Sequence, residues 1–427
     1  MASESSCASP QARCALTGTG AATAAGPSLS APRGAALYIG ALLGPGLLLL
    51  PGLAAAEAGP ASILAWLVLL GLSGLFAVVF TALGRAYPAA GGVSGYTAAG
   101  LGAPAGTAAG VSFLAGVVCG APLVALIGAT YVSRLVGGGT LVSCSVAALL
   151  LLAVLALASG GMRATTSAQL VLVCLLTVVI VAAVIGAAPG ARAGNWVPFA
   201  PHGWGSVGGA ASTLMFSFVG WEAVAPLTGR FRDPARQLPR VIGTALAVTT
   251  AIYLALAITT IAVLGRAAAT DVPLAALLAR VAGGDGKLIA AAVAVVLTLG
   301  TTNAYLTGAV TMARDLARSP ARGRSGRPFL AVIAAAGAVL LGLYGAGLVT
   351  TAQLVSLPTA LFLAAYLGCM LSATRTLRGA GRACAAAALV AVIALLAFCG
   401  WALALAAAVA GAALLASRRH RSSAAAS

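Results

Sequence analysis

The sequence predicts an all-α membrane protein with about twelve transmembrane helices. Of its 427 residues, 61% are hydrophobic and only 7% are charged. Soluble domains carry roughly 25% charged residues, so this composition excludes a globular protein with a fully hydrated surface. Apolar segments without charge also recur along the chain, at about the 20-residue length that a helix needs to cross the bilayer core.

Charge-free segments locate the individual spans. The last apolar stretch is divided into two, because a single helix across the 35 residues between Arg382 and Arg418 would measure about 52 Å, against a hydrocarbon core of about 30 Å. The predicted spans lie at roughly 35–56, 60–84, 107–133, 141–158, 165–188, 207–228, 241–264, 288–313, 329–346, 351–373, 384–398 and 401–416.

The basic residues predict the orientation of these spans. With the N-terminus inside, only five of the 24 basic residues fall in outer segments, which leaves 19 on the inner side. The positive-inside rule then places both termini in the cytoplasm, for a multi-pass protein of the cytoplasmic membrane. The net charge of +17 is thus explained by topology, and no nucleic-acid partner is expected. The five outer residues are Arg134, Arg192, Arg266, Arg280 and Lys287.

These spans divide the chain into three parts. Residues 1–33 are rich in Ala, Ser, Gly and Thr and predict a disordered cytoplasmic tail. Residues 34–417 form the predicted transmembrane domain, and residues 418–427 a second cytoplasmic tail.

One acidic residue is predicted inside a span. Of the seven acids, only Glu222 falls within a predicted helix, in the stretch FSFVGWEAVAP at 216–226. A carboxylate in the bilayer costs about 3 kcal/mol on insertion scales, so it is expected to face a cavity or a partner. In the structural alternative, Glu222 is protonated and caps a neighbouring helix. In the functional alternative, it senses protons or stabilises a gate of a transport pathway.

Two spans carry residues that interrupt helices. Gly44-Pro45-Gly46 lies near the middle of the first span, and Gly220 stands beside Glu222 in the sixth, followed by Pro226. If spans one to five (about 35–188) and six to ten (about 207–373) are repeats, these positions correspond. Five is an odd number, so the second repeat is inverted, and 384–416 forms an extra hairpin. Interrupted helices in inverted repeats are typical of secondary transporters, which bind substrate there.

An interrupted helix offers groups that suit a zwitterion. The start of one half-helix presents N–H groups that favour a carboxylate, and the end of the other presents carbonyl oxygens that favour an ammonium group. Such groups are tolerated at mid-depth only when they are buried in protein or face a ligand. The pair of interruptions therefore predicts a site for an amino acid.

Four stretches resemble the amino acid–polyamine–organocation superfamily. They are GPGLLLLPG (44–52), YPAAGGVSGY (87–96), FSFVGWEAVAPLTGRFRDPARQLPRVI (216–242) and GTTNAYLTGAVTMARDLA (300–317). The resemblance implies the LeuT-type fold, a 5+5 inverted repeat with broken helices 1 and 6. Within the superfamily the chain looks most similar to bacterial exporters of neutral amino acids.

The resemblance also implies which residues bind substrate. Gly44, Gly46 and Leu47 would offer backbone donors to a carboxylate, while carbonyl groups and an aromatic lid would come from the sixth span; ordinary packing is the alternative for its two phenylalanines. Pro45 departs from the serine usual in the superfamily and removes a hydroxyl and an N–H donor. The implied sixth-span residues are Phe216, Phe218, Val219 and Gly220, with Glu222 in coupling or gating, and Thr301, Thr302 and Asn303 as further polar groups of the eighth span.

The expected function is alternating-access transport of a small neutral amino acid similar to leucine or methionine. Coupling to protons or exchange is expected, without a cofactor or a bound metal; the fifth span carries no charge, so the lysine that some proton-coupled relatives use there is absent. A second copy of the chain, as a homodimer, is a candidate partner.

Two alternative functions remain. A transporter of another small organic solute, such as an amine, is the first. An intramembrane enzyme is the second, since Gly92-Val93-Ser94-Gly95 resembles a serine protease motif. That chemistry requires a base, and the only histidines, His202 and His420, lie in an outer loop and the C-terminal tail.

Overall fold

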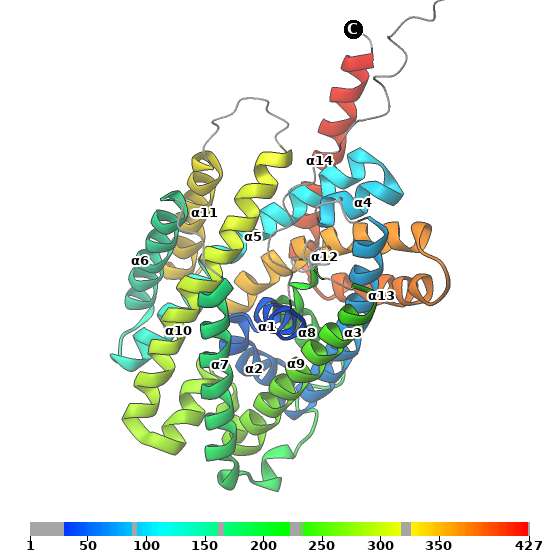
Figure 1. Cartoon of the computed structure of the whole chain (residues 1–427). Helices are drawn as coiled ribbons and strands as arrows, with labels where there is room; N and C mark the ends of the chain where they lie inside the picture. The colour runs from blue at the N-terminus through cyan, green and yellow to red at the C-terminus, as the bar shows by residue number, and fades with distance from the viewer. Residues whose placement is uncertain are drawn as a thin grey trace, which may run out of the picture.

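The computed structural model describes residues 30–87, 92–160, 166–222, 231, 234–316 and 326–425. Its regular elements in these ranges are helices, which confirms the all-α prediction (Figure 1). The predicted disordered tail lies outside the described residues up to position 29, and helix α1 begins at Ala31.

Ten helices of the described chain are long and apolar enough to cross a membrane. The number of twelve spans stays a prediction, because the first and sixth predicted spans are broken into shorter helices. The 5+5 repeat stays a prediction too. The long helices are α3 (Ser62–Ala86), α5 (Ala103–Leu135), α6 (Thr140–Ser159), α7 (Thr166–Ala187), α9 (Pro234–Leu264), α10 (Pro273–Leu316), α11 (Arg327–Gly345), α12 (Thr351–Thr376), α13 (Gly379–Ala397) and α14 (Trp401–Ala425).

The first predicted span is interrupted where the sequence indicates. Helix α1 (Ala31–Leu42) ends before the glycine–proline pair, and α2 (Gly46–Ala58) begins directly after it. Proline has no N–H to continue the hydrogen-bond ladder of α1, but its fixed φ suits the start of a helix. Pro45 accordingly caps α2 with φ −64° and ψ −15°.

The sixth predicted span is also interrupted. Helix α8 (Ser206–Leu214) tightens into a 3₁₀ turn, η5 (Met215–Phe218), and the chain becomes extended at Val219. Gly220 follows with φ 149°, a backbone conformation that side chains disfavour. Pro226 and the rest of this predicted span beyond Glu222 lie outside the described residues.

The interrupted helices occupy the interior of the bundle. α2 packs on α8, and α1 packs on α9 and α7; α1, α2 and α8 lie centrally in Figure 1. Helix α5 packs on α10 and α12, and also contacts α6, α11 and α14. Helix α10 is two helices joined at a kink at Ala282 and Gly283, and its second part reaches the centre. A short helix, α4 (Val93–Leu101), packs on α5 and α12.

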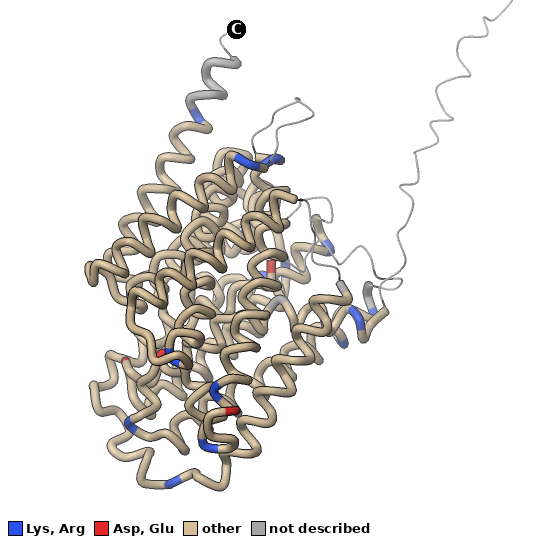
Figure 2. The backbone as a smooth tube through the Cα atoms, turned by 90° about the vertical axis from the view of Figure 1, so that its left-hand side faces the viewer, with Lys and Arg blue, Asp and Glu red and all other residues tan. Residues whose placement is uncertain are grey.

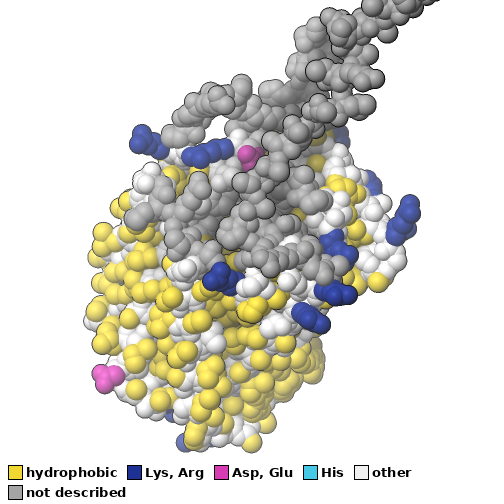
Figure 3. Space-filling model, viewed as in Figure 1, with side chains coloured by type: hydrophobic (Ala, Val, Ile, Leu, Met, Phe, Trp, Pro, Cys, Tyr) yellow, Lys and Arg dark blue, Asp and Glu magenta, His cyan; other side chains and the backbone are white. Residues whose placement is uncertain are grey.

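The surface has the character of a membrane protein. Lys and Arg lie mainly toward the ends of the bundle in Figure 2, and Figure 3 shows a broad hydrophobic face beside a margin of basic side chains. Exposed hydrophobic side chains such as Leu149, Val178 and Val390 suit contact with lipid. Helix α14 continues to Ala425, beyond the predicted end of the span at 416.

Candidate functional site

A cavity of about 500 Å³ lies where the two interruptions meet. Its walls come from α1 and the start of α2, from η5 and the turn after it, and from α5, α7 and α10. Eight of the predicted site residues line it, namely Gly44, Pro45, Gly46, Phe216, Val219, Glu222, Thr301 and Thr302. The two helix interruptions that the sequence indicates therefore border one cavity.

The other four predicted residues lie outside this lining. Leu47 is fully buried, and Phe218 is packed edge-on against Tyr253 at 5.3 Å between ring centroids. Gly220 turns the backbone behind the cavity, and Asn303 is buried in α10. The aromatic side chain of the sixth span that faces the cavity is thus Phe216, while Phe218 packs into the core.

The two interruptions touch each other directly. A Cβ atom built on Gly46 would lie 2.8 Å from Ser217 Oγ and 3.3 Å from Phe216 Cδ1. Only glycine allows the start of α2 to approach η5 this closely. Gly44, by contrast, has no atom within 4 Å of such a Cβ, so the backbone there borders open space.

Tyr253 of α9 bonds to the ends of both interrupted helices. Its hydroxyl oxygen lies 2.6 Å from the carbonyl oxygen of Leu42 and 3.0 Å from that of Ser217, so the two carbonyl groups share its single proton. The ring lies 5.3 Å from Trp66 and is fully buried. A helix end leaves carbonyl groups without intrahelical partners, and the carbonyl oxygen of Leu42 also accepts from the backbone N–H of Gly44 at 2.8 Å.

Two other tyrosines donate to the same interrupted elements from opposite sides. Tyr131 of α5 donates to the carbonyl oxygen of Leu48 in the first turn of α2, at 2.6 Å. Tyr305 of α10 donates to the carbonyl oxygen of Val219 at 3.4 Å. The backbone of both interruptions is therefore satisfied by side chains of the surrounding helices, as burial in lipid requires.

Glu222 is buried beside the second interruption, with 5% of its surface exposed. Its Oε2 accepts hydrogen bonds from the hydroxyl of Tyr366 and, at 3.0 Å, from the backbone N–H of Gly220. Next to it, Trp221 Nε1 donates to Ser73 Oγ at 2.8 Å, which fixes the turn. The second carboxyl oxygen, Oε1, has no hydrogen-bond partner among the described residues.

Two hydroxyl groups of the lining are also without partners in the described part of the chain. They belong to Ser217 and Thr302, and both are buried. The adjacent Thr301 differs, since its hydroxyl donates to the carbonyl oxygen of Leu297 at 2.5 Å. Buried polar atoms are nearly always hydrogen-bonded, so these two hydroxyls and Glu222 Oε1, all on residues that line the cavity, are candidate partners for a polar ligand.

The sequence alone does not reveal Ser217 or the tyrosines as site residues. Ser217 lies between Phe216 and Phe218 in the stretch 216–226, and serine between apolar residues is common in membrane helices without a role in binding. The one available signal is that tyrosine hydroxyls within apolar spans need partners. It does not say which partners they find.

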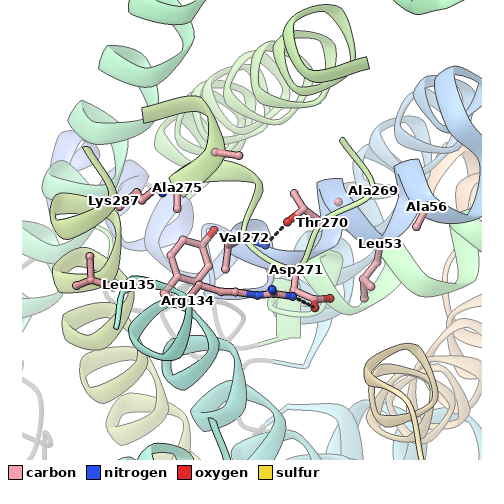
Figure 4. Close-up of a pocket in the computed structure, with 13 residues that line it drawn as sticks. Leu53, Ala56, Arg134, Leu135, Ala269, Thr270, Asp271, Val272, Ala275 and Lys287 are labelled. Atoms are coloured by element: carbon pink, nitrogen blue, oxygen red, sulfur yellow. Dashed lines mark hydrogen bonds and ion pairs between the residues drawn. The ribbon is translucent and has the colours of Figure 1, made fainter. Parts of the chain in front are cut away.

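A second, smaller cavity of about 370 Å³ lies around α2, the end of α5 and the loop before α10 (Figure 4). In Figure 4, Arg134 and Asp271 point toward each other; their ion pair spans 3.7 Å. A Cβ atom on Gly52 would overlap the carbonyl oxygen of Thr270, so the loop rests directly on α2. Residues predicted on the outer side thus pack over this end of α2.

Ser94 and His202, the serine and one histidine of the enzyme alternative, bond to different parts of the structure. The hydroxyl of Ser94 donates to the carbonyl oxygen of Gly106 at 2.9 Å, within the α4–α5 corner. His202 Nδ1 lies 2.9 Å from the carbonyl oxygen of Glu57, at the opposite end of α2 from the main cavity. The side chain of His420 lies outside the described part of the chain.

Comparison with known proteins agrees with this architecture. The family described as amino acid permease matches residues 29–423. An uncharacterized amino acid permease of Bacillus subtilis, YecA, is 29% identical over 384 residues, which are 87% of this chain and 91% of that protein. A 59-residue stretch is 41% identical to the branched-chain amino acid permease BcaP of Bacillus subtilis, across 14% of this chain and 13% of that protein.

A solved structure shares the fold. The crystal structure of MhsT in complex with L-phenylalanine superposes with a TM-score of 0.58 at 17% identity, and covers 87% of this chain and 99% of that chain. MhsT has the LeuT fold, which the resemblance in the sequence predicts. The chain therefore belongs to the amino acid permease family, within the amino acid–polyamine–organocation superfamily, as a multi-pass membrane protein.

Proposed function

We propose that this permease is a secondary active transporter that moves a small neutral amino acid by alternating access, with the 500 Å³ cavity as its substrate site. The observation that carries the proposal is the set of three buried polar atoms, on Ser217, Glu222 and Thr302, that lack partners among the described residues. All three residues line a cavity formed by two interrupted helices, the arrangement in which transporters hold their substrates.

The polar groups suit the two charges of an amino acid. The start of α2 at Gly46 faces the cavity, and the N–H groups of a helix start favour a carboxylate. Glu222 Oε1 and Ser217 Oγ, on the other side of the interruption, are acceptors for an ammonium group. We expect the substrate to lie across the contact between Gly46 and Ser217, with its charged ends on opposite elements.

The remaining walls favour an apolar side chain. Phe113, Val117, Leu297 and Phe362 line the cavity, and its only carboxylate among the described residues is that of Glu222. A cationic substrate would need a second acid, and an acidic substrate a basic residue. A branched-chain amino acid permease that shares a 59-residue stretch with this chain, and a solved structure of the same fold that holds L-phenylalanine, support the same substrate class.

Glu222 is the proposed proton-sensitive group. It is the acid at the centre of the site, and one of its oxygens is left for a ligand. We propose coupling to protons, or exchange of one amino acid for another, in the cytoplasmic membrane with both termini inside. The number of copies in the functional unit, with a homodimer as the candidate, remains a proposal too.

Transport into proteoliposomes tests the function. Purified protein is expected to take up labelled L-leucine or L-methionine, and L-arginine and L-glutamate poorly, under a pH gradient or by exchange against internal amino acid. No flux of any of these compounds under a pH gradient, a sodium gradient or exchange would contradict the substrate class.

Two adjacent threonines provide a matched control for the site. Thr302→Val removes a buried hydroxyl that lacks a partner among the described residues, and it is expected to weaken substrate binding about 3- to 10-fold. Thr301→Val removes a hydroxyl already bonded to Leu297, so its effect on affinity should be smaller. Equal effects would place the substrate elsewhere.

A further inference from the structure

The second cavity gathers two of the five basic residues predicted on the outer side. Arg134 stands near the end of α5, and Lys287 follows the kink of α10; both line the cavity (Figure 4). The other three, Arg192, Arg266 and Arg280, are not among its lining residues. The positive-inside rule draws basic residues to the cytoplasmic side, so two that meet in one outer cavity need an explanation other than topology.

The lining of this cavity carries an excess of positive charge. Asp271 is its only acid among the described residues, and Asp271 Oδ2 lies 3.7 Å from Arg134 Nη2, in an exposed and therefore weak ion pair. No carboxylate of the described chain lies within 4.0 Å of the Lys287 ammonium group. Two cations and one carboxylate leave the lining with a net charge of +1, which one monovalent anion would balance.

The two cations border the lipid-facing surface of the bundle. Leu288 and Ile289, which follow Lys287, are 56% and 45% exposed, and Val136, two positions after Arg134, is 65% exposed. Such exposed apolar side chains suit contact with lipid, and long basic side chains near the ends of spans reach the headgroups. The basic rim of the cavity is therefore expected at the depth of the lipid phosphate groups, with apolar surface beside it.

The chemistry of the two basic side chains matches a phosphate group. The guanidinium group of Arg134 is a planar fork that can bind two oxygens at once, and the ammonium group of Lys287 adds a compact charge from another helix. The phosphodiester of a phospholipid carries the one negative charge that the lining lacks. A free phosphate or a carboxylate would use the charged groups only, whereas a lipid would also cover the exposed side chains of Val136, Leu288 and Ile289.

We propose that this cavity binds the phosphate group of an anionic phospholipid between Arg134 of α5 and Lys287 of α10. The bound headgroup joins the two helices beside the loop at 269–272 and so stabilises the predicted outer end of the bundle. The cavity shares no lining residue with the proposed substrate cavity, so the inference does not depend on the proposed function.

Melting temperatures in nanodiscs test this site. Nanodiscs of phosphatidylcholine alone are compared with nanodiscs that also contain phosphatidylglycerol, whose headgroup adds no positive charge. Phosphatidylglycerol is expected to raise the melting temperature of the wild type by about 2 °C or more, because a ligand that binds only the folded protein stabilises it. Lys287→Gln and Arg134→Gln should each lose most of this rise. A wild type without a rise, or variants that keep it in full, would overturn the proposal.

Arg280→Gln is the matched control. Arg280 is an exposed basic residue of the same helix as Lys287, also predicted on the outer side, but it does not line the cavity. Its variant should therefore keep the full rise in phosphatidylglycerol. An equal loss in Arg280→Gln and Lys287→Gln would indicate a general attraction of basic residues to an anionic bilayer, and would overturn a specific site.

Two soluble compounds separate the lipid from other sources of an anion. Inorganic phosphate and L-leucine are each added to the wild type and to Lys287→Gln in phosphatidylcholine nanodiscs. Neither compound should produce a rise in melting temperature that Lys287→Gln abolishes. Such a rise with inorganic phosphate would assign the cavity to a free anion, and with L-leucine to the carboxylate of an amino acid; either result would overturn the lipid as the occupant.

Discussion

Gly46 and Ser217 meet where two interrupted helices cross, with only 2.8 Å between Ser217 Oγ and a Cβ built on Gly46. One residue begins α2 and the other lies in η5. Their contact brings the start of α2, where the N–H groups of Leu47 and Leu48 donate to the carbonyl oxygens of Gly44 and Pro45, next to η5. The proposed amino acid site lies beside this contact between the backbone of Gly46 and the side chain of Ser217.

The first prediction concerns that approach. Gly46→Ala would press a methyl group against Ser217, Phe216 and Leu50, and overpacking of this kind costs about 1–3 kcal/mol. We expect a lower melting temperature and amino acid binding weakened tenfold or more. Gly71→Ala in α3 is the control, because a Cβ there has no atom within 4 Å. Normal amino acid binding by Gly46→Ala would show that the Gly46–Ser217 contact is not needed for the substrate site.

A second prediction concerns Ser217. Ser217→Ala is expected to weaken amino acid binding about 3- to 10-fold, since it removes one hydrogen bond to the substrate. Ser112→Ala is the matched control, because the hydroxyl of Ser112 is equally buried and without a partner in the described chain but does not line the cavity. Both variants should keep the stability of the wild type. Equal affinities of the two in a binding titration would remove Ser217 from the site.

The third prediction concerns protons. Glu222→Gln keeps the shape of the side chain and an oxygen that accepts from Tyr366 and Gly220, but it cannot release a proton. Uptake driven by a pH gradient should therefore be lost, while exchange of internal for external amino acid persists at weaker affinity, because the amide nitrogen at the position of Oε1 cannot accept from an ammonium group. Uptake with and without the gradient measures this.

Glu57→Gln serves for comparison, since Glu57 is a half-buried carboxylate of α2, bonded to Thr213 at 3.2 Å. It should retain gradient-driven uptake. If Glu57→Gln abolishes it and Glu222→Gln does not, the proton-sensitive group lies in α2.

Pro45 allows a fourth prediction. Pro45→Ser restores an N–H and adds a hydroxyl at the head of α2, and the φ of −64° observed there is open to serine. We expect tighter amino acid binding, by up to about tenfold for one added hydrogen bond to a charged group. Calorimetric titration measures this. Unchanged or weaker affinity would mean that the proline sets the shape of the interruption and not its recognition of substrate.

A fifth prediction concerns the second cavity. Gly52→Ala should displace the loop at Thr270 from α2, and so increase the rate at which a cysteine at position 56, on the cavity wall, reacts with a polar maleimide. Arg134→Ala should change this rate little, because the Arg134–Asp271 pair is well exposed and contributes at most about 1 kcal/mol. A larger effect of Arg134→Ala would show that the ion pair holds this end closed.

Some of this architecture could be predicted from the sequence. The break between α1 and α2 could, because glycine and proline act locally on the backbone. The burial of Glu222 could also be expected, because a lone carboxylate in an apolar segment needs a partner.

The partners could not be predicted. Tyr253 and Leu42 lie 211 positions apart, and no local pattern distinguishes a tyrosine that satisfies another helix from one that packs. Phe216 and Phe218 look equivalent in the sequence, and only the turn of η5 decides which one faces the cavity.

The tyrosines have a consequence for the energy source of transport. A membrane potential does work only on charge that moves across it, about 2.3 kcal/mol per elementary charge per 100 mV. The hydroxyl groups of Tyr253, Tyr131 and Tyr305 carry none, and a zwitterion carries none in sum. Under the proposed coupling to protons, the charge that a voltage-driven current carries through this site would be that of the proton on Glu222.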